Sequence, residues 1–178
     1  FIGLMISYGI SDSLQPLVST NFGANRPDRI ASFVRVAVLS AVIMGGVLAA
    51  LLLLAPEMMV RLFLKSGEEG AFAIALEFST LFWPAFLFSG ASIVISSYLT
   101  SMQKPLASAS IAVSRSLVFP ALMLLLLPRF LGDAGIFISI PLAELAGLVL
   151  SLVLLTRHKP SMLVGTAGAD KAPSPSGS

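Results

Sequence analysis

Residues 33–55, FVRVAVLSAVIMGGVLAALLLLA, decide the fold class of this chain. After Arg35 the stretch carries no charge, and Pro56 ends it. A helix needs about 20 mainly apolar residues to cross the hydrocarbon core of a bilayer, whereas a spanning strand needs about half as many and alternates apolar with polar residues. The stretch therefore predicts a transmembrane helix.

The rest of the chain repeats this pattern, with short connections between the apolar runs. Four more runs are expected to cross the membrane, at 1–22, 72–100, 106–127 and 134–156. Composition agrees, because 56% of the 178 residues are hydrophobic and 11% are charged, against about 25% charged in soluble domains. We expect an all-α, polytopic transmembrane helix bundle of about five helices over 1–159, then a disordered cytoplasmic tail at 160–178, rich in Ser, Pro and Gly.

The basic residues of the connections predict how the helices are oriented in the membrane. Successive crossings reverse direction, so alternate connections lie on the same side. One side collects Arg26, Arg29, Arg35, Lys104, Arg115, Arg157 and Lys159, and the other collects Arg61, Lys65 and Arg129. This excess favours the first side as cytoplasmic. We expect a multi-pass protein of the cell (inner, cytoplasmic) membrane with a cytoplasmic C-terminus.

Enzymatic, metal-binding and nucleic-acid-binding functions find no support in the sequence. The chain has one histidine, His158, and no cysteine, so it offers no cluster of metal ligands. Its glycine-containing stretches lack the lysine and the spacing of a phosphate-binding loop. Its basic residues form short clusters, not a tract that could follow a phosphate backbone. We predict a protein that is not an enzyme, with no cofactor and no resident metal, whose partner is the lipid bilayer and not nucleic acid.

Polar residues inside the first apolar run are the main functional candidates. At about 100° per residue, one narrow face of this helix collects Tyr8, Asp12, Gln15 and Ser19. A charged group within a membrane is costly unless it faces protein or water. The stripe either lines a water-filled cavity, where Asp12 binds a cation or a proton, or joins helices through hydrogen bonds. For Asp12 itself we favour the functional interpretation.

Three more charged residues lie inside later runs. Glu77 shares a face with Pro84, whose missing N–H frees a carbonyl, and either helps to hold a monovalent cation or reaches interfacial water. Arg115 is expected to extend its side chain to the cytoplasmic boundary; the alternative is that it neutralises an acid inside the bundle. Glu144 lies too deep to reach the boundary, so it either meets a structural partner such as Arg115 or serves transport.

The stretch QPLVSTNFGANRPDRI at 15–30 resembles a motif of the multidrug and toxic compound extrusion (MATE) family of secondary transporters. The resemblance continues in order and spacing through Pro56, MQKP at 102–105, Arg115 with Pro120, and GDAGIFISIPLAE at 132–144. It covers roughly residues 1–158.

This resemblance implies a twelve-helix transporter of two lobes, of which the chain matches helices eight to twelve, a fragment of the C-terminal lobe. The N-terminal lobe and helix seven would then belong to the same longer protein. The resemblance also implies antiport, in which Na⁺ or H⁺ enters while organic cations and drugs leave by alternating access. The family's coupling acids lie on helices outside this sequence or near Gly90 and Ala91, so Asp12, Glu77 and Glu144 inherit no established role.

Two alternatives to drug efflux remain at this stage. One is a lipid-linked oligosaccharide flippase of the same superfamily, which would need more arginine in its cavity to hold phosphate. The other is a membrane scaffold subunit that does not transport. The scaffold alternative predicts that Asp12→Asn alters assembly and leaves flux intact.

Overall fold

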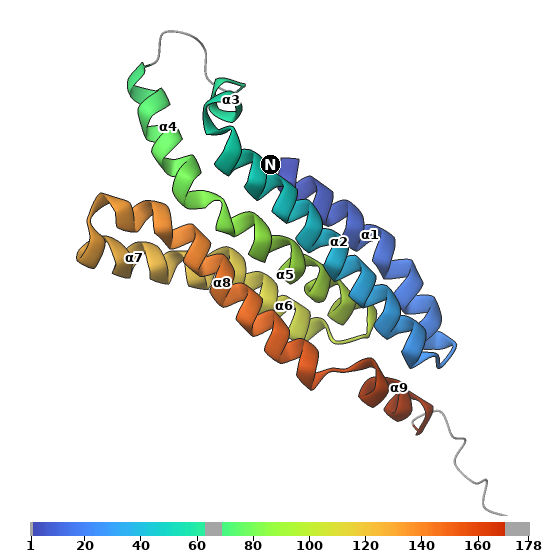
Figure 1. Cartoon of the computed structure of the whole chain (residues 1–178). Helices are drawn as coiled ribbons and strands as arrows, with labels where there is room; N and C mark the ends of the chain where they lie inside the picture. Colours follow the sequence, from blue (N-terminus) through green and yellow to red (C-terminus); the bar gives the residue numbers. More distant parts are fainter. Residues whose placement is uncertain (1, 63–68, 170–178) are drawn as a thin grey trace, which may run out of the picture.

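The computed structural model describes residues 2–62 and 69–169, and within these ranges the chain forms helices and short turns with no strand (Figure 1). The all-α prediction is confirmed. Helix α1 (Ile2–Gly23) and helix α2 (Pro27–Leu54) form an antiparallel hairpin. Their turn is closed by the Arg26 amide, which donates to the carbonyl O of Asn21 at 3.0 Å. Pro27 then begins α2 with a backbone φ that already suits a helix.

The long helix expected over 72–100 is two helices. After the short α3 (Pro56–Arg61), helix α4 (Glu69–Phe82) ends beside Trp83, and α5 (Pro84–Ser101) begins at the proline. The prediction of one continuous helix was wrong because Pro84 has no N–H and its ring clashes with the preceding turn. Lys65, which was assigned to the less basic side, lies outside the described residues.

The fourth expected crossing contains a change of helix type. It comprises α6 (Pro105–Val113), the π-helical turn η1 (Ser114–Val118) and α7 (Phe119–Leu131). Gly132 has φ +60° and ψ −140°, a conformation open essentially to glycine alone, and reverses the chain into α8 (Asp133–Arg157).

The first part of the expected disordered tail is helical. Helix α9 (Pro160–Ala169) packs against α2, and Val164 is 4% exposed. The expectation of disorder was wrong for 160–169 because Val164, with Leu163 beside it, packs into the apolar core of the bundle and anchors the helix there. The rest of the predicted tail, 170–178, lies outside the described residues.

Helix α5 is the centre of the bundle. It contacts α1 and α2 on one side and α6 and α8 on the other (Figure 1). More than half of the residues of α5 are buried, whereas most residues of α2, α8 and the α6–α7 segment are not. Its residues at the contacts are mostly small (Ser89, Gly90, Ala91 and Ser92). Small residues allow helices to approach closely where no hydrophobic effect drives them together.

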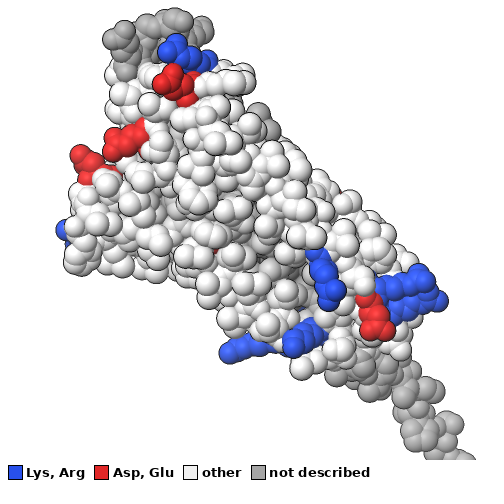
Figure 2. Space-filling model, viewed as in Figure 1, with Lys and Arg blue, Asp and Glu red and all other residues white. Residues whose placement is uncertain are grey.

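In the part of the chain that the structure describes, four helical segments are long and apolar enough to cross a membrane: α2, α5, α6 through α7, and α8. Helix α1 lies alongside them and is more polar. Figure 2 shows an almost uncharged band between two charged ends, with basic side chains gathered at the end that carries the α1–α2 turn and the start of α9. These features are those of a multi-pass membrane protein.

Candidate functional site

The polar stripe of α1 lies next to the face through which α1 packs against its neighbouring helices, and not on that face. The buried face of α1 consists of Ser7, Ser11, Leu14 and Val18. The stripe residues Tyr8, Asp12, Gln15 and Ser19 are all exposed, and none of them makes a hydrogen bond or ion pair within the described residues. Within this part of the protein, therefore, the stripe does not hold helices together.

A cavity of 210 Å³ lies beside this stripe, between α1, α5 and the α6–η1 segment. Its lining consists of Tyr8, Ser11, Asp12, Gln15, Ser92, Ile93, Ser96, Ser97, Thr100, Ile111, Ala112 and Arg115. Most of these side chains carry a hydroxyl, a carboxylate, an amide or a guanidinium group, although the helices around them are apolar. A polar cavity within an apolar bundle can hold water or a polar ligand. Ser19 shares the stripe but does not line the cavity.

One buried hydroxyl in this lining has no partner among the described residues. Ser11 is 3% exposed, and its Oγ makes no hydrogen bond within the described residues. Its backbone carbonyl O accepts from Ser97 Oγ at 3.2 Å. An unpaired buried hydroxyl costs free energy unless a water or ligand satisfies it, so the cavity offers a bonding position to a small polar guest.

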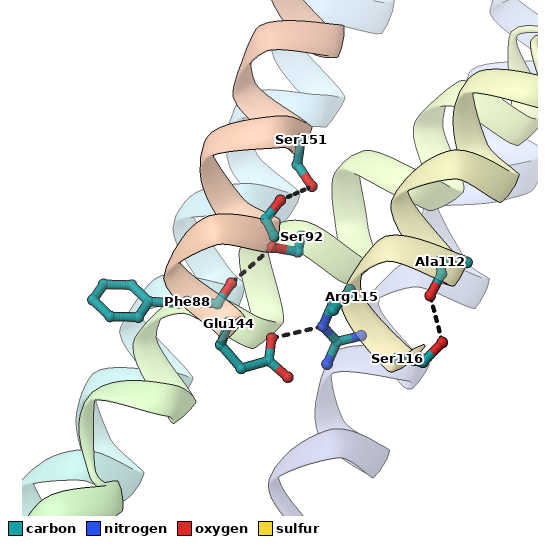
Figure 3. Close-up of polar contacts among 8 residues, drawn as sticks. Phe88, Ser92, Ala112, Arg115, Ser116, Glu144 and Ser151 are labelled. Carbon is teal, nitrogen blue, oxygen red and sulfur yellow. Dashed lines mark hydrogen bonds and ion pairs between the residues drawn. The ribbon is translucent and has the colours of Figure 1, made fainter. Parts of the chain in front are cut away.

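Arg115 does not extend to the membrane boundary as expected. Its Nε donates to Oε2 of Glu144 at 2.7 Å, and the two side chains are 15% and 16% exposed (Figure 3). The expectation was wrong because a deep carboxylate on α8 lies within reach and removes the need for the charge to find water. Glu144 thus has the structural partner that was one of its two possible explanations, whereas its role in transport stays a prediction.

The backbone around Arg115 explains how it reaches α8. Pro120 cannot donate a hydrogen bond, and the chain forms a π turn in which Phe119 N–H donates to the carbonyl O of Ser114, five residues back. On the facing helix, Gly147 has no side chain, and a Cβ there would lie 3.4 Å from Cβ and Cγ of Arg115. The aliphatic part of Arg115 therefore lies over Gly147, and its head reaches Glu144 one turn earlier.

Glu77 lies apart from the cavity. It is exposed on α4 and has no ion-pair partner among the described residues, while its backbone carbonyl O accepts from Thr80 Oγ1 at 2.8 Å. The break at Trp83 separates it from the helix that begins with Pro84. Its proposed part in cation binding stays a prediction.

Sequence reasoning missed the contribution of α5 to the cavity. Ser92, Ser96 and Thr100 recur every four residues and so share one helical face, which was the available signal. Ser96 Oγ and Thr100 Oγ1 lie 3.0 and 2.7 Å from Ser108 Oγ on α6, so they join the two helices that wall the cavity. Across residues 2–62 and 69–169, no group of three or more His, Cys, Asp or Glu side chains could hold a metal ion.

Comparison with known proteins gives one match. The family model described as MatE matches residues 1–125, from the start of α1 into α7. This covers the three segments that wall the cavity, including Asp12 and Arg115, and leaves out all of α8, which carries Glu144. No curated protein and no solved structure matches the chain.

Proposed function

Because the chain belongs to the MatE family, a family of membrane transporters, we propose that it acts in the export of organic cations, coupled to inward flow of Na⁺ or H⁺ by alternating access. The observation that carries this proposal is the polar cavity beside Asp12 in a bundle that is otherwise apolar. We also propose that the protein works in the cytoplasmic membrane with its C-terminus in the cytoplasm.

The charges around the cavity favour a cation as the guest. Asp12 and Arg115 line it, and Arg115 is already paired with Glu144. One carboxylate, that of Asp12, is therefore left without a counter-charge among the described residues. An unpaired carboxylate within the span of a membrane protein is a candidate site for a proton or a cation. Asp12 is our candidate for the group that binds drug or coupling ion, with Gln15 and Tyr8 as neighbouring polar contacts.

The small size of the cavity supports the proposal that another part of the transporter completes its walls. At 210 Å³ it is smaller than the roughly 300–1,000 Å³ typical of sites for drug-sized ligands. We propose that an N-terminal lobe and helix seven of the same protein supply the remaining walls, and that the exposed polar stripe of α1 faces them.

The flippase alternative is less well supported. A lipid-linked diphosphate requires cationic groups that are free to pair with phosphate oxygens. Among the described residues, Arg115 is the only basic one that lines the cavity, and its charge is offset by Glu144.

The test uses the full-length protein and a cationic fluorescent dye. Asp12→Asn keeps the shape of the side chain and removes its charge, so we expect efflux to fall by about tenfold or more, the effect of losing one charge-assisted contact. The matched control is Asp28→Asn, which removes a carboxylate from the first turn of α2, outside the cavity.

Both variants must reach the membrane in wild-type amounts, measured by immunoblot. Unchanged efflux by Asp12→Asn at unchanged abundance would remove Asp12 from the mechanism. If Asp12→Asn instead disrupts assembly and leaves flux per assembled protein intact, the scaffold alternative is correct.

A further inference from the structure

A second cavity lies away from the polar one and differs from it in chemistry. It has a volume of 520 Å³ and lies between α2, the C-terminal end of α8 and the start of α9. Its lining consists of Ala31, Val34, Arg35, Val38, Leu39, Val42, Leu155, Thr156, Lys159 and Pro160. We call it the α2–α8 groove. It shares no residue with the polar cavity.

The groove has an apolar length and a charged end. Along α2 it extends from Ala31 to Val42, and the helix rises by about 10 Å between Arg35 and Val42. The residues of α2 that line the groove beyond Arg35 are all aliphatic: Val38, Leu39 and Val42. The other charged member, Lys159, lies in the connection between α8 and α9.

Both cations of the groove lack an internal counter-charge. Arg35 and Lys159 are exposed, and neither has an acidic partner among the described residues. They belong to the start of α2 and to the α8–α9 connection, which lie at the end of the molecule where basic side chains gather (Figures 1 and 2). Two unpaired cations at the mouth of an apolar channel match a ligand with an anionic head and an aliphatic chain.

We propose that the α2–α8 groove binds one anionic phospholipid. Its phosphate lies between Arg35 and Lys159, and one acyl chain follows Val38 and Val42 toward the middle of the membrane. The proposal does not depend on what the polar cavity transports. The bound lipid would fill the gap between α2 and α8. It would also hold the start of α9 against α2, because α9 already contacts α2.

The test is native mass spectrometry of the purified chain after incubation with equal amounts of phosphatidylglycerol and phosphatidylcholine. The wild type should retain phosphatidylglycerol preferentially. A basic residue near an anionic lipid surface contributes about a factor of five in affinity, so Arg35→Gln with Lys159→Gln should weaken retention by about 30-fold. The matched control, Arg26→Gln with Arg29→Gln, removes two charges from the same end but outside the groove and should retain the lipid.

Two further experiments distinguish a bound phospholipid from a small anion without acyl chains and from nonspecific attraction of lipid to the positive end of the protein. Val42→Trp fills the apolar part without changing charge and should also reduce retention, while its helical circular dichroism stays that of the wild type. Glycerol phosphate, which carries the anionic group without acyl chains, should not displace the lipid. Equal losses in the two double variants, no effect of Val42→Trp, or displacement by glycerol phosphate would overturn the proposal.

Discussion

Arg115 and Glu144 form an ion pair inside the bundle, far from the charged ends of the molecule. Breaking a buried pair by removing one partner leaves an uncompensated charge, which costs about 3–5 kcal/mol, whereas replacing both residues by apolar ones is often neutral. Because each side chain keeps about 15% exposure, we expect the lower end of that range for Arg115→Met or Glu144→Leu alone. The double variant should recover most of the loss.

Thermal unfolding in detergent is compared for the wild type, the two single variants and the double variant. The comparison measures the coupling energy between Arg115 and Glu144. A transport role for Glu144 would add a separate effect, so dye efflux by the full-length double variant distinguishes the two roles. If the double variant is stable and still exports dye, the pair is structural. If the two single losses simply add, the ion pair contributes no coupling energy and our interpretation of its geometry is wrong.

A sequence determines which residues share one face of a helix. It does not determine which side chains of different helices pair with each other. The face of α1 that carries Asp12 and Gln15 follows from helical geometry alone, and the structure places both on one exposed face. The sequence left the pairing of Arg115 with Glu144 as one of two alternatives, because it does not show that a π turn changes the helical register where Arg115 lies. A single sequence also gives no signal that Gly147 leaves room for the arginine side chain on α8.

Gly45 is the point at which α2 and α5 approach most closely among their glycine contacts. A Cβ at Gly45 would overlap the backbone carbonyl of Phe86, which cannot move without shifting α5. We expect Gly45→Ala to lower the free energy of unfolding by about 1–3 kcal/mol through overpacking.

The neighbouring residue provides the control for this prediction. A Cβ at Gly46 would meet only Leu87 Cδ2 at 3.8 Å, an ordinary contact, so Gly46→Ala should be neutral or stabilise by up to about 1 kcal/mol. Thermal unfolding in detergent measures both variants. Equal midpoints for the two would show that the helices do not approach at Gly45 as the structure has them.

Prolines account for most differences between the expected and the observed elements. Pro27, Pro56, Pro84 and Pro105 each occupy the first turn of a helix, where the missing N–H is harmless. Hydropathy alone predicts one continuous helix over α4 and α5, because it does not show that a new helix begins at Pro84. Composition likewise predicted a tail where Pro160 begins α9, because an average over Ser and Gly conceals the few apolar residues that dock on α2.

On the scale of the whole molecule, the surface divides into a face for water and faces for lipid. The water face is the stripe of α1 with its cavity, and the lipid faces carry exposed aliphatic side chains such as Val149 (54% exposed) and Leu125 (68% exposed). The exposed fraction of a side chain does not distinguish the two kinds of face, because the side chains on both are exposed. The division rests on polarity, because water enters a membrane protein only along polar surfaces.

Cysteine labelling tests this division directly, because the natural chain has no cysteine and each variant carries one thiol. In membrane vesicles, Gln15→Cys should react with a membrane-impermeant maleimide at least about tenfold faster than Val149→Cys, since an apolar environment raises the pKa of a thiol and lowers its thiolate fraction. Val94→Cys, at a fully buried position on α5, supplies the unreactive baseline. In detergent followed by denaturation all three should label equally, which confirms that each thiol is present. Fast labelling of Val149→Cys in vesicles, or baseline labelling of Gln15→Cys, would show that the stripe of α1 does not face water, and the proposed cation site beside Asp12 would then have no route for its ligand.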